Sequence, residues 1–326
     1  MSTAPMVTGT VIADRFVIEG AAGSGGMSTV YQAKDLRTGH PVALKLLHHP
    51  LASPYANNRL IVEAQVLAEL RHPGIVSYIA HGHAASGQPF LVLEWLEGED
   101  LERRLQRQLL SLPECWSLLR LIADALAAAH RNGIVHRDIK PSNIFLRDAL
   151  IERATLLDFG VARQLQQENA LTHSGVLLGT PEYMSPEQAR GQRDIGTSAD
   201  IFSLGCVLFE GITGRPPFVA ANLSAQLAKV LFEQAPPLAT LRPDVPLAMS
   251  ALLDRMLAKE AELRPQDGDA LLELIQSLGE LTFEDRPSQL SRPQRLFVGE
   301  ERLIAIVRAS PWAAQGSKAE TLEPEQ

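Results

Sequence analysis

A single stretch of the sequence combines a carboxylate, an ammonium group and an amide. Asp138, Lys140 and Asn143 lie within residues 134–143, directly after a glycine that ends a helical segment. Groups of these kinds can orient a hydroxyl, stabilise a phosphoryl group in transfer and hold a metal ion. The spacing therefore indicates phosphoryl-transfer chemistry on one short loop.

A second carboxylate, Asp158, follows the apolar residues 156–157. Asp158 and Asn143 both offer hard oxygen ligands, and Mg²⁺ prefers a few protein oxygens together with phosphate and water. We expect these two side chains to share one divalent cation.

A glycine-rich segment, Gly23-Ser24-Gly25-Gly26, lies between two expected strands. Because glycines lack Cβ atoms, the backbone amides of such a loop can approach phosphate oxygens closely. Taken alone, the segment is equally compatible with an ordinary glycine-rich hairpin.

Lys45 lies in the apolar segment 41–47, beside this loop in the expected sheet. An unpaired ammonium group among buried residues is costly to desolvate, so Lys45 needs a counter-charge or a phosphate. Glu63, on an expected helix at 58–71, can supply the counter-charge and hold Lys45 toward the phosphates of a nucleotide. The alternative is a surface lysine and a solvated glutamate.

The elements that must position these groups fall into two regions. Short strands are expected at 11–19, 30–35, 41–47 and 90–93, together with the single helix at 58–71. Long helices follow, and the first begins at the capping box Ser111-Leu-Pro-Glu114. The other expected helices cover residues 198–210, 223–232, 246–259 and 269–279. The sequence thus predicts an α+β fold with a β-rich first lobe and a helical second lobe.

The domain organisation follows from changes in composition. Residues 1–10 are small and polar and are expected to form a flexible N-terminus. One domain is expected over 11–280, with lobes at about 11–94 and 97–280. Residues 281–326 are predicted to be a linker and tail, and their apolar run at 303–307 either docks back on the domain or opens a further domain.

The chain has 326 residues and a formal net charge of −8, from 30 Lys and Arg against 38 Asp and Glu. This acidic balance gives no general attraction to nucleic acid or to an anionic membrane surface, so neither is an expected partner. No apolar run approaches about 18 residues and no signal peptide is recognisable, so membrane insertion is not expected and the location is predicted to be cytoplasmic. The two cysteines, far apart, fit a reducing compartment.

The motifs, in their order along the chain, resemble the eukaryotic-like (Hanks-type) serine/threonine protein kinase family, of bacterial type, over residues 11–280. The resemblance rests on the glycine-rich loop, Val42-Ala-Leu-Lys45, Glu63, His136-Arg-Asp138, Asn143, Asp158-Phe-Gly160, residues 179–187, residues 200–205 and Arg264. It implies a two-lobed kinase fold that transfers the γ-phosphate of ATP to Ser or Thr hydroxyls of proteins.

The resemblance also implies roles for the matching charged residues. Asp138 would accept the proton of the substrate hydroxyl, and Lys140 would stabilise the γ-phosphate. Lys45, paired with Glu63, would contact the α and β phosphates of ATP.

The same resemblance implies metal ligands and structural contacts. Asn143 and Asp158 would hold Mg²⁺, for which Mn²⁺ can substitute. Glu187 would pair with Arg264, and Asp200 would anchor the loop that begins at residue 136.

The adenine site is likewise implied by the resemblance. Val30, Ala43 and Phe145 would enclose the ring, and the backbone from Glu94 to Leu96 would bind its edge.

The same resemblance indicates the substrate class and the regulation. Lys140 and Thr180 are typical of serine/threonine rather than tyrosine kinases. Thr172 and Ser174 are expected autophosphorylation sites, because a phosphate adds charge and acceptors that Arg137 could bind. The alternative is that both are ordinary polar loop residues. Two copies of the chain could form a dimer in which one phosphorylates the other.

Two residues depart from the family pattern. Ser28 replaces the third glycine of the loop, and Ser185 stands where alanine is usual and is expected to have no chemical role. A pseudokinase that signals by conformation is one alternative function, although every group that the chemistry needs is present. A small-molecule kinase of related fold is another, although the long segment ending at residues 179–181 favours a peptide substrate.

Overall fold

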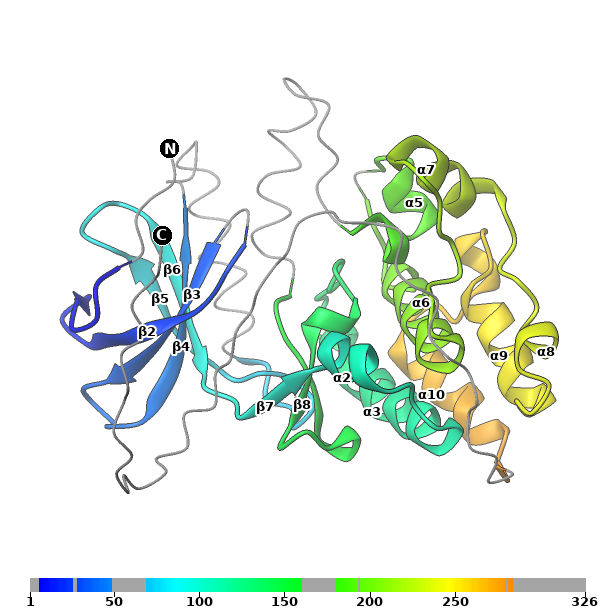
Figure 1. The fold of residues 1–326 in the computed structure, drawn as a ribbon, viewed down its shortest axis with the longest axis horizontal. Coiled ribbons are helices and arrows are strands. Elements are labelled where there is room, and N and C mark those ends of the chain that lie inside the picture. Colours follow the sequence, from blue (N-terminus) through cyan, green and yellow to red (C-terminus); the bar gives the residue numbers. More distant parts are fainter. Residues whose placement is uncertain are drawn as a thin grey trace, which may run out of the picture.

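The computed structural model describes residues 6–25, 28–48, 69–159, 180–192, 194–279 and 281–283. A curved β-sheet forms one end of the molecule and a group of helices forms the other (Figure 1). A small three-stranded sheet lies at their junction. The two-lobed α+β arrangement predicted from the sequence is therefore confirmed.

The first lobe is built on a six-stranded sheet in the order β1-β2-β3-β4-β6-β5, with every neighbouring pair antiparallel. Its strands are β1 (Val11–Ile12), β2 (Phe16–Ser24), β3 (Ser28–Asp35), β4 (Pro41–Leu47), β5 (Tyr78–His83) and β6 (Pro89–Glu94). Side chains alternate between the two faces of each strand, so Thr29 and Tyr31 of β3 are buried whereas Val30 is only half-buried. The buried face carries the core of this lobe, including Phe16, Leu44 and Phe90.

Two parts of this sheet differ from the expected elements. The single strand expected at 11–19 is two strands, because Ala13 and Asp14 have left-handed backbone with φ of 51° and 53°. The chain reverses there, and Ile12 pairs with Phe16. Strand β5 was not predicted, since its sequence Tyr-Ile-Ala-His-Gly-His lacks a regular apolar alternation.

The second lobe is mainly helical. Its helices are α2 (Leu101–Arg107), α3 (Leu112–Arg131), α5 (Pro186–Ala189), α6 (Ser198–Thr213), α7 (Leu223–Phe232), α8 (Leu238–Leu241), α9 (Leu247–Met256) and α10 (Gly268–Ser277). The small sheet contains β7 (Gly98–Asp100), β8 (Ile144–Arg147) and β9 (Ala154–Leu156), and short 3₁₀ turns occur at Pro141–Asn143, Ile151–Arg153, Pro181–Tyr183 and Ala261–Leu263.

The predicted capping box starts α3. Glu114 N donates to Ser111 Oγ, and Ser111 N donates back to the Glu114 carboxylate at 2.7 Å. These two bonds satisfy amide groups that a helix N-terminus otherwise leaves without partners.

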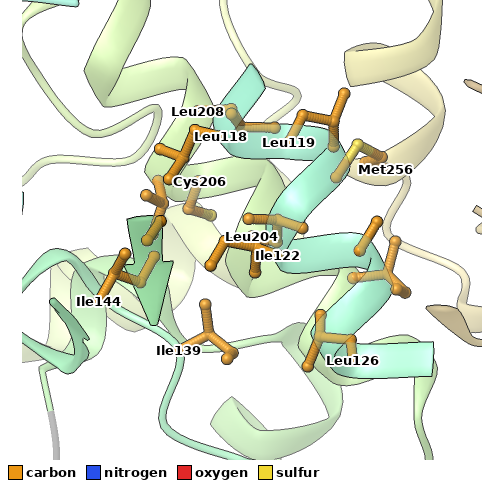
Figure 2. Packing of buried hydrophobic residues seen from close by; sticks show 14 of the residues in the cluster. Leu118, Leu119, Ile122, Leu126, Ile139, Ile144, Leu204, Cys206, Leu208 and Met256 are labelled. Carbon is orange, nitrogen blue, oxygen red and sulfur yellow. The ribbon is translucent and has the colours of Figure 1, made fainter. Parts of the chain in front are cut away.

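Helices α3 and α6 form the centre of the second core. Every residue of α6 is buried, as its all-round apolar sequence predicts. Figure 2 shows Ile122 and Leu126 of α3 near Leu204 of α6, with Ile139 and Ile144 packed beside them. This core reaches the loop that carries Asp138, and it provides a rigid support for that loop.

Several predictions concern parts of the chain outside the described residues. These parts are residues 1–5, residues 58–68 of the expected helix, and the tail from 284 onward. The domain boundary near 280 and the role of the tail stay predictions. Within the described residues, no helix is both long and apolar enough to cross a membrane.

Candidate active site

The predicted catalytic loop brings its three polar side chains together. Lys140 Nζ lies 3.0 Å from Asp138 Oδ2, and Asn143 Nδ2 donates to the same carboxylate oxygen at 3.0 Å. Asn143 Nδ2 also donates to the Asp138 carbonyl at 2.8 Å. Between these residues, Ile139 points into the helical core and is 1% exposed. Lys140 is itself buried, 5% exposed, so its ammonium group is held against Asp138 inside the site.

The start of the loop is anchored by the buried carboxylate of Asp200, as the family resemblance implies. Its two oxygens accept the backbone N–H groups of His136 and Arg137, each at 2.7 Å. His130 Nε2 lies 3.0 Å from Asp200 Oδ2 and comes from α3. Arg137 has a φ of 64°, a conformation that a residue with a side chain adopts only when its surroundings impose it.

His136 joins this loop to the segment that carries Asp158. Its Nε2 contacts the Leu157 carbonyl at 2.7 Å, and its ring packs on Phe159 with centroids 4.7 Å apart. Full burial lowers the pKa of His136. The neutral imidazole therefore acts as a fixed structural bridge, donating one N–H to that carbonyl.

The predicted nucleotide-side lysine meets the second carboxylate. Lys45 Nζ and Asp158 Oδ2 are 2.8 Å apart, although 113 positions separate the two residues in the sequence. Asp158 has a φ of 47°. Lys45, on β4 of the first lobe, and Asp158, after β9 of the second, thus form a contact between the lobes at the candidate site.

The donor set fits a magnesium ion shared with a phosphate ligand. The Asn143 amide nitrogen is committed to Asp138, so the amide oxygen is the atom that this residue can offer a cation. Asp158 supplies a carboxylate. Among the described residues no group of three His, Cys, Asp or Glu side chains could hold a metal ion by itself, and the remaining ligands would come from phosphate and water.

Two residues expected at the adenine site lie in one cluster, and the strand register places two more. Phe145 and Leu96 belong to one small apolar cluster. Strand pairing sets Val30 opposite Lys45. Ala43 lies opposite Leu93, the residue that precedes Glu94. The sequence did not indicate Val76 and Leu157, two further members of this cluster, because they lie in short segments without periodicity.

The segment that joins the lobes is fixed through Glu94. Its carboxylate accepts from Arg147 at 2.7 Å and from Ser77 N at 2.8 Å, and its own N–H donates to the Ser77 carbonyl at 2.9 Å. The side chain thus holds the backbone that was predicted to bind the adenine edge.

The glycine-rich loop is described through Gly23, Ser24 and Gly25. Ser24 Oγ lies 3.2 Å from Thr29 Oγ1, which lies 2.9 Å from His48 Nε2. Gln88 Nε2 donates to the His48 carbonyl at 2.9 Å. A chain of hydrogen bonds, missed from the sequence, therefore links the base of the loop to the turn before β6.

The predicted ion pair between Glu187 and Arg264 is present and buried. Arg264 donates to both carboxylate oxygens, at 2.8 and 3.0 Å, and also to the carbonyls of Ala258, Lys259 and Ser198. This pair ties the segment around α5 to the end of the helical lobe.

Ser185, expected to have no chemical role, caps α5. It is fully buried, and Gln188 N donates to its Oγ at 3.4 Å. The sequence pattern Ser-x-x-Gln is a capping-box signature and could have indicated this contact.

Four predicted site residues lie outside the part of the chain that the structure describes. They are Gly26, Glu63, Thr172 and Ser174. Their assignments, including the Lys45–Glu63 pair, stay predictions.

Comparison with known proteins agrees with this geometry. Residues 16–288 match the model of the protein kinase domain family. The DNA damage-responsive serine/threonine-protein kinase RqkA of Deinococcus radiodurans is 37% identical over 273 residues, covering 83% of this chain and 40% of that protein. The serine/threonine-protein kinase PknB of Mycobacterium tuberculosis is 36% identical over 270 residues, covering 80% of this chain and 42% of that protein.

The chain therefore spans less than half the length of these two curated relatives. The crystal structure of the Mycobacterium tuberculosis PknI kinase domain superposes with a TM-score of 0.66 at 25% identity, over 84% of this chain and 99% of that one. From its sequence match and its fold, the chain belongs to the protein kinase family, and its relatives are bacterial serine/threonine-protein kinases.

Proposed function

We propose that the chain transfers the γ-phosphate of ATP to serine or threonine hydroxyls of protein substrates. The observation that carries this proposal is the Asp138 carboxylate, held by Lys140 and Asn143 beside the Lys45–Asp158 contact. A carboxylate so held, with the two lysines Lys45 and Lys140 in the same site, matches what phosphoryl transfer requires.

The reaction needs positioning and charge stabilisation more than covalent chemistry. The substrate hydroxyl oxygen forms a bond to the γ-phosphorus while the bond from that phosphorus to the bridging oxygen of ADP breaks. Asp138 accepts the hydroxyl proton, and Lys140 stabilises the charge on the transferred group. Lys45 binds the α and β phosphates.

Asn143 and Asp158 would hold Mg²⁺, with Mn²⁺ as a substitute. The bound ion supplies charge neutralisation on the phosphates. Lys45 lies 2.8 Å from the same carboxylate and would share it with the ion.

Regulation is proposed to occur by autophosphorylation at Thr172 and Ser174, with a second copy of the chain as the partner in this reaction. A phosphate there gains charge-assisted hydrogen bonds to Arg137. We place the protein in the cytoplasm, where two buried free thiols such as those of Cys115 and Cys206 remain reduced.

The test is phosphate transfer by the purified chain with Mg²⁺ and ATP, using a generic basic protein as acceptor. D138N and D158N should each lower turnover by about 10²- to 10⁴-fold without changing the melting temperature markedly. Wild-type rates in either variant would refute the assigned role. If wild-type protein binds ATP but transfers no phosphate, the pseudokinase alternative is favoured.

A further inference from the structure

The side chain of Gln188 connects α5 with the catalytic loop. Its Nε2 donates to the Arg137 carbonyl at 2.8 Å, whereas its Oε1 accepts from Ser185 N at 3.0 Å. One amide therefore makes two contacts with different consequences: the oxygen completes the cap of α5, and the nitrogen reaches a loop 51 residues away in sequence.

The peptide that receives this second bond is directly joined to Asp138. The Arg137 carbonyl and the Asp138 N–H belong to the same planar unit, and the Asp138 N–H donates to His136 Nδ1 at 3.3 Å. The N–H on the other side of Arg137 donates to Asp200. Gln188 therefore holds the one carbonyl whose rotation would turn the backbone of Asp138.

This contact matters because the loop is strained at that point. Arg137 has left-handed backbone with φ of 64°, which for a residue with a side chain persists only where surrounding contacts impose it. Asp200 imposes the conformation from the N-terminal side of Arg137. Gln188 does so from the C-terminal side, where the catalytic carboxylate follows.

We propose that Gln188 is a positioning residue for Asp138. Through it, the geometry of the Asp138 carboxylate depends on whether residues 180–188 are packed in place. When this segment is seated, the Gln188 amide fixes the Arg137–Asp138 peptide. When it is displaced, the peptide loses a constraint, and Asp138 moves from the position suited to the substrate hydroxyl. The inference rests on the proposed role of Asp138 as the proton acceptor.

Two kinds of substitution separate positioning from helix capping. Q188E keeps an oxygen for the Ser185 N–H but cannot donate to the Arg137 carbonyl when ionised. Q188M removes the donor without adding charge and has a similar length. S185A is the matched control, because it removes the hydroxyl of the cap and leaves the Gln188 amide in place.

The experiment measures the rate of a single turnover of phosphate transfer to a basic acceptor protein at saturating ATP. Preparations are matched for phosphate content by intact mass and checked by thermal denaturation. We expect Q188E and Q188M to slow transfer at least about tenfold, since small misplacements of a catalytic group have effects of this size or larger. The KM for ATP should stay within twofold, and S185A should keep the wild-type rate within twofold.

A Q188M rate within twofold of wild type would overturn the proposal. So would an S185A rate reduced as much as that of Q188M, because capping would then explain both. D138N in the same assay tests the underlying assignment separately. If D138N turns over normally, Asp138 is not the proton acceptor, whatever the Gln188 variants do.

Discussion

The two sides of the candidate site are held in different ways. The loop around Asp138 is fixed by buried side chains that bind backbone groups, above all the Asp200 carboxylate with its bonds to His136 and Arg137. On the nucleotide side, Lys45 is positioned mainly by the antiparallel pairing of β4 with β3 and β6. The loop around Asp138 is thus fixed by specific side chains, whereas Lys45 is fixed mainly by backbone pairing that many sequences can form.

The strongest way to break this contrast is to remove Asp200. D200A leaves two backbone N–H groups and the His130 ring without their acceptor in a buried site, where each such loss costs about 1–3 kcal/mol. We expect the free energy of unfolding to fall by roughly 3 kcal/mol or more, and single-turnover transfer to fall more than tenfold. Denaturant titration and rapid-quench assays measure the two effects.

The matched control in the first lobe is D35A. Asp35 is buried and accepts from Arg15 at 2.9 and 2.7 Å, so its loss should also destabilise the protein. Transfer by the folded fraction should stay within twofold of wild type. A D35A enzyme as slow as D200A would show that stability alone controls the rate.

The loop around Asp138 should also make the stability of the protein depend on pH, through His136. Burial lowers the pKa of this residue, so below about pH 6.5 the unfolded chain binds a proton that the folded protein does not. The contribution of this residue to stability is therefore largest above pH 6.5 and decreases as the pH falls through that value. H136Q, whose amide can still donate to the Leu157 carbonyl, should have a smaller loss of unfolding free energy between pH 7 and about pH 5.5 than wild type. Equal losses in both proteins would assign the acid sensitivity to other groups.

The smallest effect is expected on the glycine-rich loop. T29V removes the hydroxyl that links Ser24 to His48 and preserves the shape of the side chain. Because backbone pairing of β2 with β3 remains, we expect the KM for ATP to rise only about two- to fivefold, with kcat within twofold. Initial rates over a range of ATP concentrations measure this. A loss of kcat comparable with that of Q188M would contradict the division between the two sides.

The sequence predicted best those features that short-range patterns determine. The capping box at Ser111, the fully buried α6 and the cluster of Asp138, Lys140 and Asn143 all depend on residues close together in the chain. The residues of the loop are neighbours in sequence, so their meeting in space required no knowledge of the fold.

Contacts between segments that are distant in the sequence were harder to predict. The Lys45–Asp158 contact joins two lobes, and spacing alone suggested only that both residues lie near phosphate. The bond from Gln188 to Arg137 depends on how α5 packs under the catalytic loop, which no local pattern encodes. Strand β5 forms because β6 offers it a partner, despite a weak strand pattern of its own.

The contacts of Glu94 determine how the two lobes can move. Its carboxylate accepts from Ser77 N on the sheet side and from Arg147 on β8 of the second lobe. A side chain tied to both sides at one point resists separation of the lobes but permits rotation. Relative movement of the two lobes around a nucleotide would therefore be a hinge motion with its axis near Glu94.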